Sequence, residues 1–295
     1  MVQQEDPEYV LSWRDEIKGG KRIGSTIYTC GPILYGPVKN PRGVVRAQKD
    51  QGFDFIKLYS SVSKEEFHEA IATAKELGIY TAGHIPFAVG LDGVLSEGMN
   101  EIAHIEELDF EFLDFDRSKK LGRMEWFRYL MELSVQQWGE SFGLDIEGLE
   151  KKYGSSVSAV IGKVQSADVP VCTTLAVGKG IVQKLFEPEV FLARPETTYL
   201  PPWYLDAFRQ GKEKHQVMFK GNEELAPFKH KMELVLLRKL KQARVNLVLS
   251  TDAGTGGMGI VPGFSLHDEL QIRTPCLRPT GRRFAPLPPP YPGVR

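Results

Sequence analysis

The sequence predicts an α/β protein of the (β/α) barrel class, in which parallel strands alternate with helices. Short runs of apolar and β-branched residues recur along the chain, and stretches with helical periodicity separate them. Within about the first hundred residues the connections are also short, which is typical of parallel strands joined by right-handed crossovers. At 295 residues the chain is long enough for one such barrel, since these domains run to about 250 residues.

Six segments have the composition of strands. Each is rich in β-branched, aliphatic or aromatic residues and is bounded by glycine, proline or polar residues. In chain order they are STIYTCGPIL (25–34), FDFIKLY (53–59), IYTAGHI (79–85), NEIAHIE (100–106), VPVCTTLAV (169–177) and VNLVLSTDAG (245–254). We therefore expect six parallel strands.

The helix after the second of these segments has the clearest end signals. Ser63 and Glu66 form a capping box, in which the serine accepts from the third helical N–H and the glutamate reaches back to the serine N–H. Gly78 ends the helix, because glycine readily adopts the left-handed conformation that closes a helix. The segment YVLSWRDEIKGG near the start and LDGVLSEG after the third strand segment predict two further helices.

Two longer segments depart from the strand–helix rhythm. Residues 109–168 have helical patterns and are too long for a simple crossover, so we expect an inserted helical segment. Residues 186–225 are rich in proline and aromatic residues, which predicts a loop and short helices over the barrel mouth. The amphipathic segment KHKMELVLLRKLKQARV predicts a helix that leads into the last strand.

The end of the chain differs in kind from the rest. Residues 273–295 are rich in proline and arginine and have no helical or strand periodicity, whereas FSLHDELQI before them has the pattern of a helix start. One interpretation is a disordered Pro/Arg-rich extension. The interpretation that we favour is out-of-frame translation beginning near Gln271 or Ile272. The predicted barrel domain therefore covers residues 8–272.

Composition excludes several classes of function. The formal net charge is −1, from 37 basic and 38 acidic residues, which gives no electrostatic case for a nucleic-acid partner. No apolar run approaches the roughly 18 residues of a membrane span. Cys30, Cys172 and Cys276 lack CxxC spacing and are interpreted as buried or free thiols. MVQQEDPEYV is not a secretory signal, so the cytoplasm is the default compartment, although we expect the native N-terminus to be missing.

Four residues with suitable chemistry for a metal site stand at the ends of predicted strands. In chain order they are Lys57, His84, His104 and Asp252. A (β/α) barrel gathers the carboxyl ends of its strands at one mouth, so these residues should converge there. Two imidazoles, a carboxylate and a lysine at such a mouth predict a hydrolytic site of the zinc type.

Each of these residues also has a structural interpretation. Taken alone, Lys57 could be a surface residue, and His84 and His104 could be structural histidines; their order and shared position favour a site. The other histidines do not follow strands, and we interpret them as surface residues, with helix capping as an alternative for the last. They are His68, His215, His230 and His267.

With these residues in place, the chain resembles the metal-dependent amidohydrolase superfamily, in the branch with imidazolonepropionase-like and prolidase-like members. The resemblance runs from about Glu8 to Ile272. Its motifs are YTCGPILYG, GFDFIKLY, AGHIP, EIAHIEEL and LVLSTDAG followed by GFSLHDEL. It implies a (β/α)8 barrel with a small β-sandwich formed by the two chain ends.

The resemblance also implies a role for each candidate residue. Lys57 would be carboxylated and would bridge two divalent metals, usually zinc, while His84 and His104 would bind the second metal. Asp252 would bind the first metal and act as the catalytic base, accepting a proton from the nucleophile and donating it to the leaving amine. Lys57 favours the dinuclear, dipeptidase-like members over the mononuclear type.

The chain departs from the family in one large respect. The family's first strand supplies an HxH pair, and this sequence contains none. We therefore expect about six of the eight strands, truncation at both ends, and weak or absent binding of two metals.

The expected function is a metal-dependent hydrolase of C–N bonds, with dipeptides or N-acyl amino acids as small-molecule substrates, impaired in this fragment. The alternative is a non-catalytic remnant that binds a small ligand or a metal. Self-association into a homo-oligomer is left open.

Overall fold

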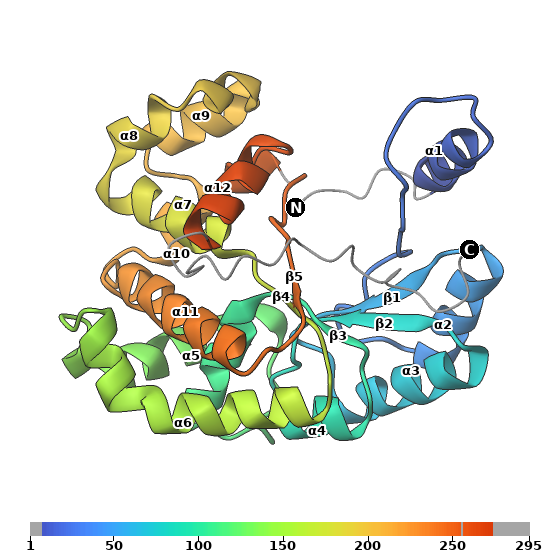
Figure 1. Cartoon of the computed structure of the whole chain (residues 1–295), viewed down its shortest axis with the longest axis horizontal. Helices are drawn as coiled ribbons and strands as arrows, with labels where there is room; N and C mark the ends of the chain where they lie inside the picture. The colour runs from blue at the N-terminus through green and yellow to red at the C-terminus, as the bar shows by residue number, and fades with distance from the viewer. Residues whose placement is uncertain (1–7, 255, 274–295) are drawn as a thin grey trace.

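One parallel sheet forms the centre of the molecule in the computed structural model, which describes residues 8–254 and 256–273 (Figure 1). Its strands lie side by side in chain order, and every pairing is parallel. They are β1 (Phe55–Leu58), β2 (Tyr80–Gly83), β3 (Glu101–Ile102), β4 (Val171–Cys172) and β5 (Leu247–Val248). The expected α/β class and parallel order are confirmed.

The first of the six expected strands is reduced to two isolated parallel bridges. Cys30 pairs with Phe55 and Leu34 with Leu58, so the segment 25–34 runs beside β1 without forming a strand. Pro32 lies between the two bridges and has no N–H to donate, which interrupts the ladder. Within the described residues the sheet is open, since it ends at β5 on one side and at this bridged segment on the other.

The register of the sheet separates two faces. Leu58, Ile102 and Val171 are fully buried and belong to the main hydrophobic core, which also contains apolar side chains of the surrounding helices. Successive side chains of a strand point to opposite faces. Lys57 is paired in register with Ala82, and both therefore lie on the other face, the one that carries the candidate site.

The first half of the chain contains the three helices predicted there and one more. They are α1 (Glu8–Lys18), α2 (Pro41–Asp50), α3 (Lys64–Leu77) and α4 (Gly90–Ser96). At the start of α3 the Ser63 Oγ atom accepts from the Glu66 N–H at 3.2 Å, and the Glu66 carboxylate accepts from the Ser63 N–H at 2.8 Å. Gly78 closes α3 with a φ of 60°, so both predicted end signals are confirmed.

The expected inserted helical segment consists of η1 (Ile105–Phe112), α5 (Arg123–Trp138), η2 (Gly139–Ser141) and α6 (Ile146–Ser166). The patterns in IEGLEKKYG and SAVIGKVQSA belong to one continuous helix, α6. The long helix α11 (Leu225–Gln242) packs against α6, α7 and η1. Its buried apolar residues, including Leu236 and Leu240, contribute to the main core.

A group of mostly short helices forms a second layer, which Figure 1 shows above the sheet on the side toward which β5 leads. The group contains α7 (Leu175–Phe186), α8 (Pro188–Leu192), η3 (Pro195–Tyr199), α9 (Pro202–Arg209), α10 (Lys214–Met218), η4 (Gly256–Met258) and α12 (Phe264–Arg273). The short helices expected in residues 186–225 are thus present. We call this group the helical layer, and it has a small core of its own around Phe191 and Tyr204.

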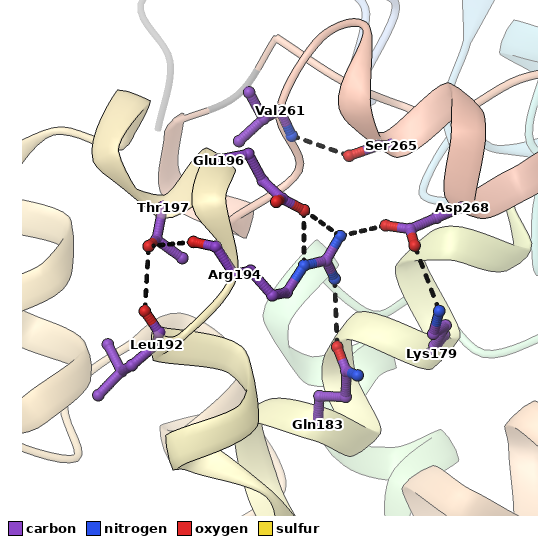
Figure 2. A network of polar contacts seen from close by, with 9 residues as sticks. All are labelled: Lys179, Gln183, Leu192, Arg194, Glu196, Thr197, Val261, Ser265 and Asp268. Atoms are coloured by element: carbon purple, nitrogen blue, oxygen red, sulfur yellow. Dashed lines mark hydrogen bonds and ion pairs between the residues drawn. The ribbon is translucent and has the colours of Figure 1, made fainter.

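Within the helical layer, Arg194 joins α7 and η3 to α12 (Figure 2). Its Nε atom donates to Glu196 Oε1 at 2.6 Å, and its Nη1 atom donates to Gln183 Oε1 at 3.1 Å. Its Nη2 atom pairs with the Asp268 carboxylate on α12, which also lies 3.2 Å from Lys179 Nζ on α7. One guanidinium therefore joins the helices before and after the last strand.

The helix start expected in FSLHDELQI is confirmed as α12, and it continues to Arg273. The Ile272 side chain packs against the main core. Residues 274–295, which carry the rest of the predicted tail and Cys276, lie outside the described residues. Among those described, Cys30 and Cys172 are free thiols, and no helix has the length and hydropathy that a bilayer span requires.

Candidate functional site

The rings of His84 and His104 lie next to each other at the ends of adjacent strands. Their centroids are 4.7 Å apart, and the two residues are only 8% and 7% exposed. His84 follows β2 directly, and His104 lies two residues beyond the end of β3. The structure therefore brings together two of the residues that the sequence singles out.

A close backbone contact positions His84. The preceding residue, Gly83, has a φ of 152°, and a Cβ atom at this position would lie 2.1 Å from the Leu58 carbonyl oxygen. Only glycine fits there. The same carbonyl accepts a hydrogen bond from the His84 N–H at 3.1 Å, so the chain leaves β2 in a defined direction.

His104 reaches the site through an unusual backbone conformation. Simple alternation along β3 would place it on the helix side with Ile102. Its φ of 74° breaks that alternation, and its ring contacts His84 instead. Thr174 after β4 and Asp252 after β5 also have positive φ values, of 48° and 51°. Such conformations cost of order 1–3 kcal/mol each and cluster at functional sites.

Polar partners hold both rings through the same nitrogen. The Nδ1 atom of His84 lies 2.5 Å from Glu107 Oε1 and 3.0 Å from Ser60 Oγ. The Nδ1 atom of His104 lies 3.2 Å from Thr174 Oγ1. The atom that remains for a ligand in each ring is Nε2. A histidine oriented by a carboxylate through its other nitrogen is the common arrangement at protein metal sites.

Burial keeps both imidazoles neutral. It lowers the pKa of His84 to about 3, and the nearby positive charge of Lys57 acts in the same direction. Burial also lowers the pKa of His104 to about 4, assisted by His84. The carboxylate of Asp252 opposes both shifts without cancelling them. At neutral pH the two rings are therefore in the unprotonated form that binds metals.

Two neighbouring glutamates of η1 complete the surroundings. Burial raises the pKa of Glu107 to about 8, and its carboxyl group contacts His84 Nδ1. Burial also raises the pKa of Glu106, but the positive charge of Lys229 and the interactions with His104 outweigh it, and the pKa is lowered overall. Neither glutamate was expected at the site from the sequence, although both lie within three residues of His104 in the run HIEE.

Lys57 and Asp252 lie at the same end of the sheet as the two histidines. Both are half-buried, and their charges act on the pKa values of His84 and His104. In the part of the chain that the structure describes, no three His, Cys, Asp or Glu side chains converge closely enough to hold a metal ion. The donor chemistry of the paired imidazoles fits a divalent cation of the zinc type. The ligand roles of the four residues stay predictions.

His215 corrects the interpretation of the remaining histidines. It is 3% exposed, and its Nδ1 atom lies 2.5 Å from Lys184 Nζ in the interior of the helical layer. His230 is also half-buried and pairs with Glu233 at 3.1 Å. His68 and His267 are exposed, as expected. The surface interpretation of His215 is wrong because a buried ion pair, which sequence periodicity does not reveal, encloses it.

The partners of His215 form a closed cluster. Lys184 Nζ donates to Glu213 Oε1 at 3.1 Å and to the Met258 carbonyl at 3.0 Å. The other carboxylate oxygen of Glu213 accepts from the His215 N–H at 2.9 Å. The side chains of Lys184 and Glu213 are each 1% exposed. A lysine on the apolar face of LAVGKGIVQKLF was the one sequence signal for this cluster.

No protein-family model matches the chain, and no curated protein matches its sequence. Among solved structures, the chain is similar to the bottromycin amidohydrolase AH, with a TM-score of 0.57 over 94% of this chain. The chain therefore shares the fold of that protein over the part that it spans. The identity is 20%, so this likeness concerns the fold, and at that level it confirms the resemblance inferred from the motifs.

A second solved structure is a Xaa-Pro dipeptidase with methionine bound in its active site. It has a TM-score of 0.49 and 15% identity over 92% of this chain. The chain spans 56% of the length of the bottromycin amidohydrolase and 57% of the length of the dipeptidase.

Proposed function

We propose that this chain carries the site of a metal-dependent hydrolase that cleaves C–N bonds in small amide or peptide-like substrates, such as dipeptides or N-acyl amino acids. One observation carries the proposal. Two buried, neutral imidazoles, those of His84 and His104, are in contact at the ends of adjacent parallel strands, and the Nδ1 atom of each is held by a polar partner. The amidohydrolase fold supports the same reaction class.

In this proposal His84 and His104 hold a divalent cation, probed most simply as zinc, with Asp252 and a carboxylated Lys57 as further ligands. A cation held there would supply a hydroxide nucleophile at neutral pH and would polarise the scissile carbonyl. Asp252 is the catalytic residue: it accepts the proton of the attacking water and returns it to the leaving amine. Glu107 orients the His84 ring through Nδ1.

The first test combines metal content with hydrolysis. The full chain is loaded with zinc in bicarbonate buffer, its zinc content is measured, and release of amino acids from a dipeptide panel is followed. We expect Asp252→Asn to remove turnover and leave the free energy of unfolding nearly unchanged. Asp206→Asn is the matched control, because Asp206 is an exposed aspartate of α9 that pairs with Arg209. Equal loss of folding and turnover in Asp252→Asn would make Asp252 a structural residue.

Carboxylation of Lys57 has a separate test. If this lysine forms a carbamate, Lys57→Ala should abolish any dependence of activity and zinc content on bicarbonate. Lys64→Ala, at the exposed first residue of α3, serves as the control. Activation by bicarbonate that persists in Lys57→Ala would refute the carbamate.

The second candidate function is binding of a metal or small ligand without turnover. It is favoured by one observation, that the described residues do not bring three His, Cys, Asp or Glu ligands together. Zinc that binds to the wild-type chain and is lost in His84→Ala, with hydrolysis at background level, would support this alternative. Zinc content that is unchanged by both His84→Ala and His104→Ala would contradict both functions.

A further inference from the structure

A row of aromatic rings leads from the paired histidines toward the surface. The Tyr59 ring, just beyond β1, has its centroid 4.1 Å from that of His84. The Tyr35 ring lies 4.7 Å from Tyr59 on its other side. Arg123, the first residue of α5, places its guanidinium carbon 5.5 Å from the Tyr35 centroid and 5.7 Å from the Tyr59 centroid. The Tyr59 ring therefore lies between the guanidinium of Arg123 and His84, a candidate metal ligand.

The guanidinium of Arg123 has its hydrogen-bonding capacity available. Arg123 is exposed, and it forms no ion pair with the other residues that the structure describes. By contrast, Arg117 and Arg194 are paired with Glu111 and Asp268. Contact with two tyrosine rings restricts the guanidinium plane while its N–H donors stay accessible to a ligand.

The surface beside this pair of tyrosines offers room for a ligand. Tyr35 lines a groove of about 350 Å³ together with Lys39 and apolar residues such as Ile33 and Val38. The groove thus combines apolar walls with a second positive charge.

We propose that Arg123, held over Tyr35 and Tyr59, binds the carboxylate group of the substrate. The planar guanidinium matches a carboxylate through two parallel hydrogen bonds, a geometry that lysine cannot reproduce. The inference rests on the proposed function and narrows it: the substrates are C–N compounds with a free carboxylate. Its central claim, carboxylate binding, can be measured without turnover.

The test compares three small probes of similar size, titrated calorimetrically into the full chain with and without zinc. N-acetyl-L-alanine carries an α-carboxylate, N-acetyl-L-alanine amide carries none, and N-acetyl-L-aspartic acid α-amide carries only a side-chain carboxylate. We expect the wild type to bind at least one acid roughly tenfold or more tightly than the neutral amide, as a charge-assisted contact predicts. The preferred acid identifies which carboxylate is recognised.

The variants separate this contact from general effects. Arg123→Met should remove the preference for the acid, and Arg123→Lys should retain only part of it because the paired hydrogen bonds are lost. Arg128→Met is the control, since Arg128 is also an exposed arginine of α5. Equal binding of acids and amide by the wild type would overturn the proposal, as would the same loss in Arg128→Met and Arg123→Met.

Hydrolysis distinguishes failure of this inference from failure of the proposed function. If the chain hydrolyses dipeptides and their C-terminal amides with equal KM, and Arg123→Met changes neither, the reaction stands and the carboxylate site is refuted. If Arg123 governs carboxylate binding while hydrolysis stays at background level, the binding site stands and the hydrolytic function fails. A rise in KM for dipeptides in Arg123→Met, with kcat nearly unchanged, supports both.

Discussion

The molecule buries histidines in two regions, and the two regions treat them differently. At the strand ends, His84 and His104 lie side by side, and the Nδ1 atoms make their hydrogen bonds. In the helical layer, His215 lies against Lys184, whose ammonium also donates to Glu213 and to a backbone carbonyl. Burial lowers the histidine pKa in both regions.

The difference lies in the groups that hold each ring. In the helical layer the charge of Lys184 has a carboxylate partner, and the cluster joins α7, α10 and the segment after β5, so it fastens elements together. At the strand ends the two neutral rings lie against each other, each is held at Nδ1, and the backbone of His104 has a positive φ. The two regions therefore differ in the chemistry of the group at Nδ1, which is an ammonium for His215 and a carboxyl or hydroxyl group for His84 and His104.

The largest effect is expected when the cluster of Lys184, Glu213 and His215 in the helical layer is broken. Lys184→Met would leave the buried Glu213 carboxylate without its cation, and removal of one partner of a buried pair typically costs about 3–5 kcal/mol. Urea unfolding measures the loss. Lys179→Met is the matched control on the same helix, because Lys179 pairs with Asp268 and its side chain is 33% exposed; we expect a loss of about 1 kcal/mol or less. Similar losses in the two variants would show that burial of the pair is unimportant.

The next effect tests whether the strand-end pair is the metal site. Glu107→Gln removes the carboxylate that orients His84 and should weaken zinc binding by about 10- to 100-fold, as is usual for a partner of a metal-binding histidine. His215→Gln should leave zinc affinity unchanged, because the structure encloses this histidine in its own cluster. Calorimetric titration with zinc measures both. A weaker site in His215→Gln and an unchanged one in Glu107→Gln would reverse the assignment of the two regions.

The smallest effect is a pH dependence confined to the helical layer. Burial raises the pKa of Glu213, but hydrogen bonding to His215 and the charge of Lys184 outweigh it and lower the pKa from 4.5 to about 2. A depressed carboxyl pKa stabilises the folded state above the unfolded pKa, and this stabilisation is lost as the pH falls through the folded pKa.

The wild type should therefore lose stability relative to Glu213→Gln as the pH falls. Between about pH 6 and about pH 3.5, the difference in the free energy of unfolding between the two proteins should change by about 1 kcal/mol. Urea unfolding at several pH values measures the difference between the two proteins. Glu196→Gln, which removes a carboxylate from the Arg194 network, serves as a comparison (Figure 2). A difference that stays constant with pH would show that the Glu213 pKa is not depressed.

The order of strands and helices, and the strand ends that carry Lys57, His84, His104 and Asp252, could be predicted from the sequence. The reason is that these features are local. Alternation, helical periodicity, capping residues and glycines depend on neighbours within a few positions, and a parallel arrangement then places the strand ends together. The capping box of Ser63 shows how reliable such local signals are.

Only the tertiary structure decided the contacts between distant residues. The positive φ of His104, which turns its ring toward His84, depends on how β3 continues into η1 and has no periodic signature. The burial of His215 depends on Lys184, 31 positions earlier in the chain. The approach of Arg123 to Tyr59 likewise joins α5 to the end of β1. Such contacts arise from packing of whole elements, so local sequence patterns determine which elements form, and their packing determines which side chains meet.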